Sequence, residues 1–134
     1  MFKRKIYSKM QEWKKDSDGK TALLIEGARR IGKSTVVEEF AKNEYESYIL
    51  IDFARASKET KELFEDVSDL NFLFLQLQLQ YRVDLQERKS VIIFDEVQLC
   101  PAARQAIKAL VADHRYDYIE TGSLISIKKN VKDI

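Results

Sequence analysis

The chain has 134 residues, of which 45% are hydrophobic and 34% are charged. This length and composition fit one soluble globular domain over residues 1–134 and exclude a disordered or fibrous chain. The formal net charge of +1 gives no basic footprint for nucleic acid, and no stretch approaches the ~18 consecutive apolar residues of a membrane span. A single cysteine and a single histidine exclude an internal disulfide and a cysteine-built zinc site, and they favour a reducing, cytoplasmic location.

The first residues of the chain predict a helix over about residues 1–15. Ile6, Met10 and Trp13 recur at helical spacing among lysines, so they form one apolar face. This segment lacks the apolar core of a signal peptide. We expect Trp13 to anchor the helix on the rest of the domain.

Four short apolar runs predict strands. Their apolar residues are continuous rather than alternating, which is typical of strands that are buried on both faces of a parallel sheet. The runs are Thr21–Glu26, Ser47–Asp52, Ser90–Asp95 and Asp117–Thr121. Helical patterns at Ser34–Lys42 and Pro101–Ala112 lie between them. Alternating strands and helices predict a three-layer α/β fold.

The segment Leu70–Tyr81 is ambiguous. Its leucines alternate with glutamines near the end of the segment, which is typical of a strand with one wet face. Equally, a stripe at helical spacing is formed by Leu70, Leu73, Phe74, Leu77 and Tyr81. We favour a helix, because leucine and glutamine are good helix formers and β-branched residues are scarce here.

The loop after the first predicted strand carries the clearest motif. The sequence GARRIGKS over residues 27–34 matches G-x-x-x-x-G-K-[ST], between a buried strand and an amphipathic helix. Glycines at both ends allow backbone N–H groups to surround a phosphate, and the helix start adds a positive dipole end. The alternative is a strand–helix turn that binds nothing, which a match at every fixed position makes improbable.

We predict a role for each residue of this loop. Lys33 would contact the β- and γ-phosphates, the Ser34 hydroxyl would bind Mg²⁺, and Thr35 would touch the α-phosphate. The predicted nucleotide-binding residues are Gly27, Ala28, Arg29, Arg30, Ile31, Gly32, Lys33, Ser34 and Thr35.

The third predicted strand ends in two acids, in the sequence VIIFDE. A buried strand carries a carboxylate only at its tip, where the carboxylate meets solvent or a cation. We therefore predict that Asp95 holds the Mg²⁺ shell and that Glu96 acts as general base on water. A strand that enters an acidic loop looks the same, so the loop at residues 27–34 supports this interpretation. Glu96 favours a hydrolysing ATPase of the additional-strand class, and the guanine-reading N-K-x-D tetrad is absent.

The fourth predicted strand ends in the sequence ETGS over residues 120–123. In an additional-strand sheet of order 1-4-3-2, this tip lies between the phosphate-binding loop and Asp95. Thr121 or Ser123 is then a sensor that contacts a phosphate oxygen or the attacking water. A glycine turn with a capping serine explains the sequence equally well. Gln98 is a further candidate contact of this site, or a polar loop residue.

Together these segments resemble a known family. EGARRIGKST, YILIDF, IIFDEVQ and YIETGSLIS resemble the prokaryotic AAA-type ATPases, in which a P-loop domain precedes a C-terminal domain of unassigned function. The resemblance implies Mg-ATP binding and hydrolysis, and self-association through the AAA domain. It carries over Lys33, Ser34, Asp95 and Glu96 as phosphate, metal and catalytic residues, and Ser123 as a sensor where asparagine is usual.

The resemblance also implies a fifth strand and a helical lid. Only 13 residues follow Thr121, so we expect an N-terminal fragment that lacks the lid and the arginine finger. Such a fragment would bind ATP without efficient turnover. The alternative function is a nucleotide-operated switch or assembly module that binds ATP with little hydrolysis.

Overall fold

The structure is a computed structural model that describes residues 2–26 and 33–122, with side chains for 4–26 and 34–122. Its elements in chain order are α1 (Phe2–Ser17), β1 (Leu23–Glu26), α2 (Lys33–Glu44), β2 (Ser47–Asp52), α3 (Lys58–Glu62), the 3₁₀ helix η1 (Leu63–Glu65), α4 (Leu70–Tyr81), β3 (Ser90–Asp95), the 3₁₀ helix η2 (Val97–Leu99), α5 (Pro101–Asp113) and β4 (Asp117–Gly122). No helix among these residues is long and apolar enough to cross a membrane.

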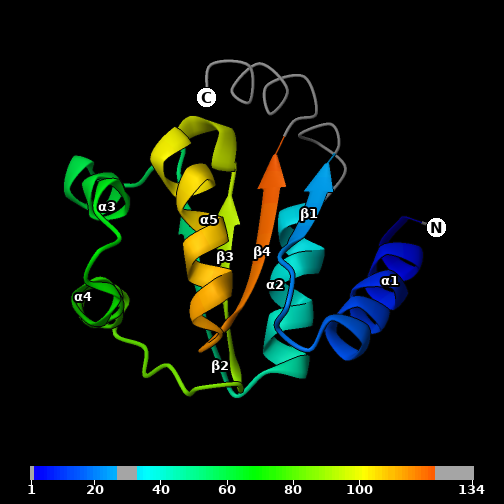
Figure 1. Ribbon diagram of the computed structural model, residues 1–134. Helices are drawn as coiled ribbons and strands as arrows, with labels where there is room; N and C mark the ends of the chain where they lie inside the picture. The colour runs from blue at the N-terminus through cyan, green and yellow to red at the C-terminus, as the bar shows by residue number, and fades with distance from the viewer. Residues whose placement is uncertain (1, 27–32, 123–134) are drawn as a thin grey trace.

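The four strands form one parallel sheet in the order β1-β4-β3-β2. This is the predicted α/β class with the predicted strand order, consistent with a P-loop fold of the AAA type. Every residue of β3 and β4 is buried, as expected for central strands that are covered on both faces. The carboxyl ends of all four strands point to one edge of the sheet (Figure 1).

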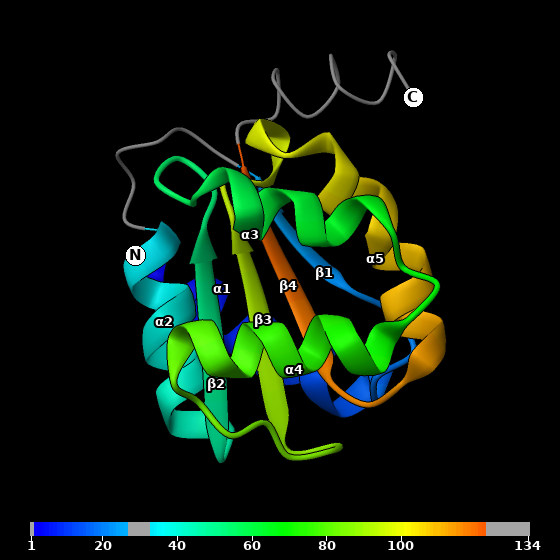
Figure 2. The ribbon, with the colours of Figure 1, turned by 90° about the vertical axis from the view of Figure 1, so that its left-hand side faces the viewer.

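Helices cover both faces of the sheet. α1 and α2 pack on one face, whereas α3, α4 and α5 pack on the other (Figures 1 and 2). Neighbouring residues of β3 point to opposite faces: Ile93 joins the core under α1 and α2, and Phe94 joins the core under α4 and α5. The continuous apolar run of β3 therefore supplies both cores.

The ambiguous segment Leu70–Tyr81 is a helix, as favoured. Asp69 begins it as N-cap, because its Oδ1 accepts the backbone N–H of Phe72 at 3.1 Å. Arg82 ends it in the left-handed conformation, with φ 54°. The inward stripe of Leu73, Phe74 and Leu77 is buried, so packing on the sheet stabilises the helical pattern.

The short helix α3 and the turn η1 have no counterpart in the sequence predictions. Ser57 is the N-cap of α3, and its hydroxyl accepts the backbone N–H of Thr60 at 3.1 Å. The helix α3 spans only five residues. A helix this short leaves too few turns for an apolar period to show.

A polar cluster joins the amino ends of the strands, at the edge opposite the strand tips. Asp117 begins β4 and is 5% exposed. It accepts hydrogen bonds from Arg88 Nη2 at 2.8 Å and from the Tyr45 hydroxyl at 2.5 Å. Burial and then the bond to Asp117 raise the pKa of Tyr45 above its usual value. The positive charge of Arg88 offsets the free-energy cost of burying the Asp117 carboxylate.

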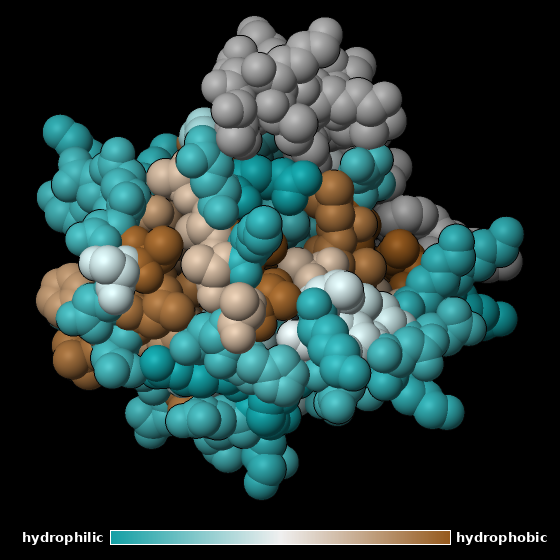
Figure 3. Space-filling model, in the orientation of Figure 1, coloured by the Kyte–Doolittle hydropathy of each residue, from teal (hydrophilic) through white to brown (hydrophobic). Residues whose placement is uncertain are grey.

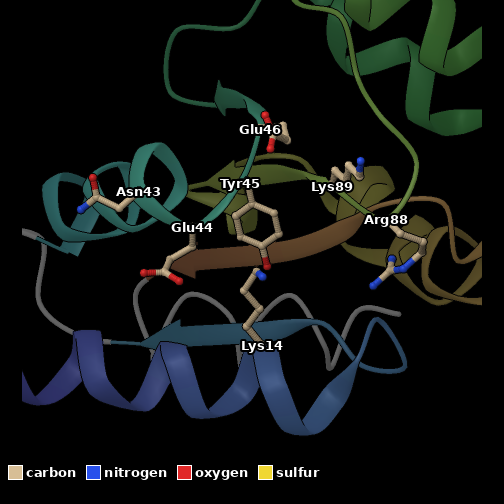
Figure 4. Close-up of a pocket in the computed structure, with 7 residues that line it drawn as sticks. All are labelled: Lys14, Asn43, Glu44, Tyr45, Glu46, Arg88 and Lys89. Atoms are coloured by element: carbon tan, nitrogen blue, oxygen red, sulfur yellow. The ribbon is translucent and has the colours of Figure 1, made fainter.

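A cavity of about 300 Å³ lies beside this cluster (Figure 4). In the figure, Lys14 of α1 extends towards Tyr45, and Arg88 lies to one side of them; the Lys14 Nζ is 4.9 Å from the centre of the Tyr45 ring. The Arg88 guanidinium also lies against Gly19, where φ is +79° and an added Cβ would lie 2.3 Å from Arg88 Nη2. Gly19 thus allows the turn after α1 to close on this arginine.

A second buried ion pair ties α5 to β4. Nη1 of Arg104 donates to both carboxylate oxygens of Glu120, at 2.8 and 2.9 Å, and the Glu120 side chain is 3% exposed. Burial raises the pKa of Glu120 above its usual value, and Arg104 acts in the opposite direction. Because the folded-state pKa is raised, this group weakens stability as pH rises above 4.5, the ordinary value for glutamate.

We predict that Arg104→Ala lowers the free energy of unfolding at pH 7 by about 2–4 kcal/mol, because it leaves the Glu120 carboxylate buried without its cation. The loss should shrink towards pH 4.5, where Glu120 takes up a proton. Urea unfolding at both pH values measures this. Arg55→Ala is the control, since Arg55 is 89% exposed in its pair with Asp52 and should cost little. A loss of equal size at both pH values would contradict the role of the charge.

Candidate nucleotide site at the strand tips

The sheet register places several of the predicted site residues at one edge. β3 and β4 pair with Phe94 beside Glu120, so the next residues along, Asp95 and Thr121, are also neighbours. α2 begins at Lys33, which brings Ser34 to the same edge. Ligands of open α/β sheets bind at this carboxyl edge.

Ser34 and Asp95 are in direct contact. The Ser34 hydroxyl donates a hydrogen bond to Oδ1 of Asp95 at 2.8 Å, across 61 positions of sequence. Asp95 is 8% exposed. A hydroxyl and a carboxylate are hard oxygen donors of the kind that Mg²⁺ binds beside a nucleotide phosphate. The donor set therefore fits the predicted metal.

The hydroxyl of Thr121 is hydrogen-bonded to both acids at the tip of β3. Thr121 is 0% exposed. Its hydroxyl donates to Asp95 Oδ1 at 2.5 Å and accepts the backbone N–H of Glu96 at 3.1 Å. In the structure this hydroxyl joins Asp95 and Glu96, which follow one another in the chain, and its contact with a phosphate oxygen or water stays a prediction.

Glu96 has an unusual backbone conformation. Its φ and ψ are 55° and 52°, in the left-handed region that costs a non-glycine residue of order 1 kcal/mol. The bond from its N–H to Thr121 stabilises this conformation. Gln98 lies two residues further on, in η2, and its side-chain amide donates to Glu96 Oε1 at 2.7 Å. The half-buried Glu96 carboxylate is therefore positioned from both its backbone and its side chain.

Several predicted residues fall outside the described part. Gly27, Ala28, Arg29, Arg30, Ile31 and Gly32 lie there, and so does Ser123. Lys33 is described only as the first residue of α2. Thr35 is exposed near the start of the same helix.

Asp52 was not predicted as a site residue, although it lies at the same edge. It ends β2 and pairs in register with Asp95. Its Oδ1 accepts the backbone N–H of Ala54 at 3.0 Å, so its carboxylate closes the turn that follows the strand. The sequence could have indicated Asp52, because it is an acid at the end of a predicted strand, as Asp95 is.

Three other residues have structural surroundings. His114 is exposed and caps α5, with its Nε2 3.0 Å from the carbonyl oxygen of Asp18. Cys100 is 4% exposed, and burial raises the pKa of its thiol. Trp13 packs against the core under α1 and α2.

Comparison with known proteins gives one match. A family model described as "AAA domain" matches residues 19–133, which is most of the chain. No curated protein and no solved structure matches. The matched range contains the predicted phosphate-binding sequence at residues 27–34, the four described strands and both acids at the tip of β3. The chain therefore belongs to the AAA domain family of nucleotide-binding proteins.

Proposed function

We propose that this domain binds Mg-ATP at the strand tips and hydrolyses it. The observation that carries the proposal is the 2.8 Å hydrogen bond between the Ser34 hydroxyl and Asp95. These two residues come from separate motifs, and each motif alone has another explanation. Their contact is the pairing that a shared Mg²⁺ requires.

Each side chain has a distinct part in this proposal. Lys33 and the backbone N–H groups of residues 27–34 hold the phosphates, and Ser34 and Asp95 hold the metal. Bound Mg²⁺ supplies charge neutralisation on the phosphate oxygens. Glu96 accepts a proton from the attacking water. Thr121 and Gln98 orient Glu96, in view of their bonds to its N–H and its carboxylate. Ser123 remains the proposed sensor.

The alternative is a switch that binds ATP with little hydrolysis. One observation favours it: Glu96 Oε1 already accepts a hydrogen bond from Gln98, and a carboxylate held in this way is a less available base. The two functions share the binding step and differ in turnover. ATP affinity and ATP turnover measured on the same sample therefore separate them.

Lys33→Ala tests the binding step. We expect ATP affinity to fall by about 10- to 100-fold, because the substitution removes a charged hydrogen-bond donor to phosphate. Isothermal titration calorimetry with Mg-ATP measures the change. Lys42→Ala is the matched control, since Lys42 is an exposed lysine in the last turn of the same helix. Equal affinities for Lys33→Ala and the wild type would show that this loop does not hold the nucleotide.

A further inference from the structure

The outer face of α4 is apolar and exposed. Phe72 and Leu75 are each 52% exposed, and Leu79 is 63% exposed. Figure 3 shows hydrophobic surface at the left of the view, where Figure 1 places α4. Three large apolar side chains on one helical stripe form a patch of the kind that marks an interaction surface.

The stripe has the spacing of a helix-packing face. Phe72, Leu75 and Leu79 are three and four residues apart, so they project from one side of the helix. The inward residues of α4 already occupy the opposite side, against the sheet. None of the twelve residues of α4 is charged, although 34% of the chain is charged. This face therefore offers no charged groups along the helix to bind a highly charged partner.

Charge appears only where the helix ends, and its sign differs between the two ends. Asp69 precedes the stripe by three residues and is exposed, and Arg82 follows it by three residues and is exposed. A helix whose amino end is acidic and whose carboxyl end is basic is complementary to an antiparallel copy of itself. The helix dipoles are also favourably opposed in that arrangement.

We propose that α4 is a self-association surface that pairs with α4 of a second copy of this chain, in antiparallel orientation. A two-fold axis near Leu75 and Gln76 sets Phe72 opposite Leu79 of the second copy. The same axis sets Asp69 opposite Arg82. Every residue of the stripe then meets a suitable partner, as an isologous contact requires. The proposal does not depend on ATP hydrolysis.

The contact is weak by itself. One helix pair buries less than the roughly 1,200 Å² of a stable standard-size interface. We therefore expect a dimer that dissociates on dilution, measured by sedimentation velocity over a series of concentrations up to the high micromolar range. A wild-type chain that stays monomeric over the whole series would overturn the proposal in favour of another occupant.

Leu75→Gln tests the face. Glutamine keeps the helix propensity of leucine, and the position is exposed, so the fold should persist. We expect dimer affinity to fall by about tenfold or more, because two buried leucines are lost per dimer. Leu99→Gln is the matched control: Leu99 is 40% exposed but lies in η2, so its loss should leave the dimer unchanged. Equal dimer affinity for Leu75→Gln and the wild type would overturn the proposal.

Cysteine cross-linking tests the orientation. Cys100 is the single native cysteine, and Cys100→Ala provides the background. Leu75→Cys should form a disulfide-linked dimer by itself, because this position lies near the axis. Phe72→Cys and Leu79→Cys should cross-link only when mixed, since identical positions lie about 10 Å apart along an antiparallel pair. Self-cross-linking of Phe72→Cys would indicate a parallel pair and overturn the proposal.

Discussion

Glu96→Gln is expected to leave ATP binding intact while turnover falls by about 10²–10⁴-fold, the usual effect of losing a general base. Glutamine keeps the size of the side chain and its acceptor oxygen. That oxygen still accepts the bond from the Gln98 amide, which is 2.7 Å long in the wild type. The backbone bond from residue 96 to Thr121 is also unaffected by this change. The substitution therefore removes the basic group and little else.

Turnover and affinity have to be measured together for this variant. A coupled phosphate-release assay gives kcat, and calorimetry gives the affinity for Mg-ATP. Glu87→Gln is the control, because Glu87 is an exposed glutamate before β3. An unchanged kcat in Glu96→Gln, in a preparation where the wild type turns over, would assign hydrolysis to another group. A wild type that binds ATP without turnover would favour the switch.

The sheet was predictable because burial determines strand sequence. β2 and β3 were predicted with their observed bounds, Ser47–Asp52 and Ser90–Asp95, since a strand covered on both faces is apolar throughout. β1 begins two residues later than predicted, at Leu23. Among the strands of the described residues it is at the edge and pairs with β4 alone, so fewer strand neighbours define where it begins.

The sequence indicated which residues meet at one sheet edge, but not how their side chains are hydrogen-bonded there. The spacing from Ser34 to Asp95 indicated two residues at one sheet edge, and they are hydrogen-bonded. Thr121 was also placed at this edge. Its hydroxyl, however, can rotate towards phosphate or towards a neighbouring strand. The direction of the hydroxyl depends on the left-handed backbone conformation of Glu96, which brings the backbone N–H of Glu96 within 3.1 Å of it. Glutamate is not a residue type that indicates a positive φ, so this conformation could not be predicted from the sequence.

The packing of α4 explains why its secondary structure was hard to predict. Leucines occupy both its buried and its exposed faces, so its sequence has no single apolar stripe and the strand alternative stayed open. Ordinary surface helices place polar residues on the outer face. The leucines on the outer face of α4 therefore made its secondary structure ambiguous in the sequence, and the same leucines indicate that this face packs against another protein surface.

Asp95→Asn is expected to weaken Mg-ATP affinity and turnover together, unlike Glu96→Gln. Asparagine keeps the Oδ1 acceptor for the two hydroxyls that now reach Asp95, from Ser34 and Thr121, so the fold should lose only about 1 kcal/mol of stability. What disappears is the negative charge beside Ser34 that favours a divalent cation.

The expected size of the effect is about 10- to 100-fold in Mg-ATP affinity and of the order of 10³-fold in kcat, since metal charge on the phosphates stabilises the transition state by several kcal/mol. Titrating ATP with and without Mg²⁺ isolates the cause: the wild type should bind ATP more tightly with the metal, and Asp95→Asn should lose most of that difference. Asp84→Asn, at an exposed aspartate, should keep it. An unaltered Mg²⁺ dependence in Asp95→Asn would mean that the contact between Ser34 and Asp95 serves only to join α2 to β3, and the metal would then have to be held by other residues at the strand tips.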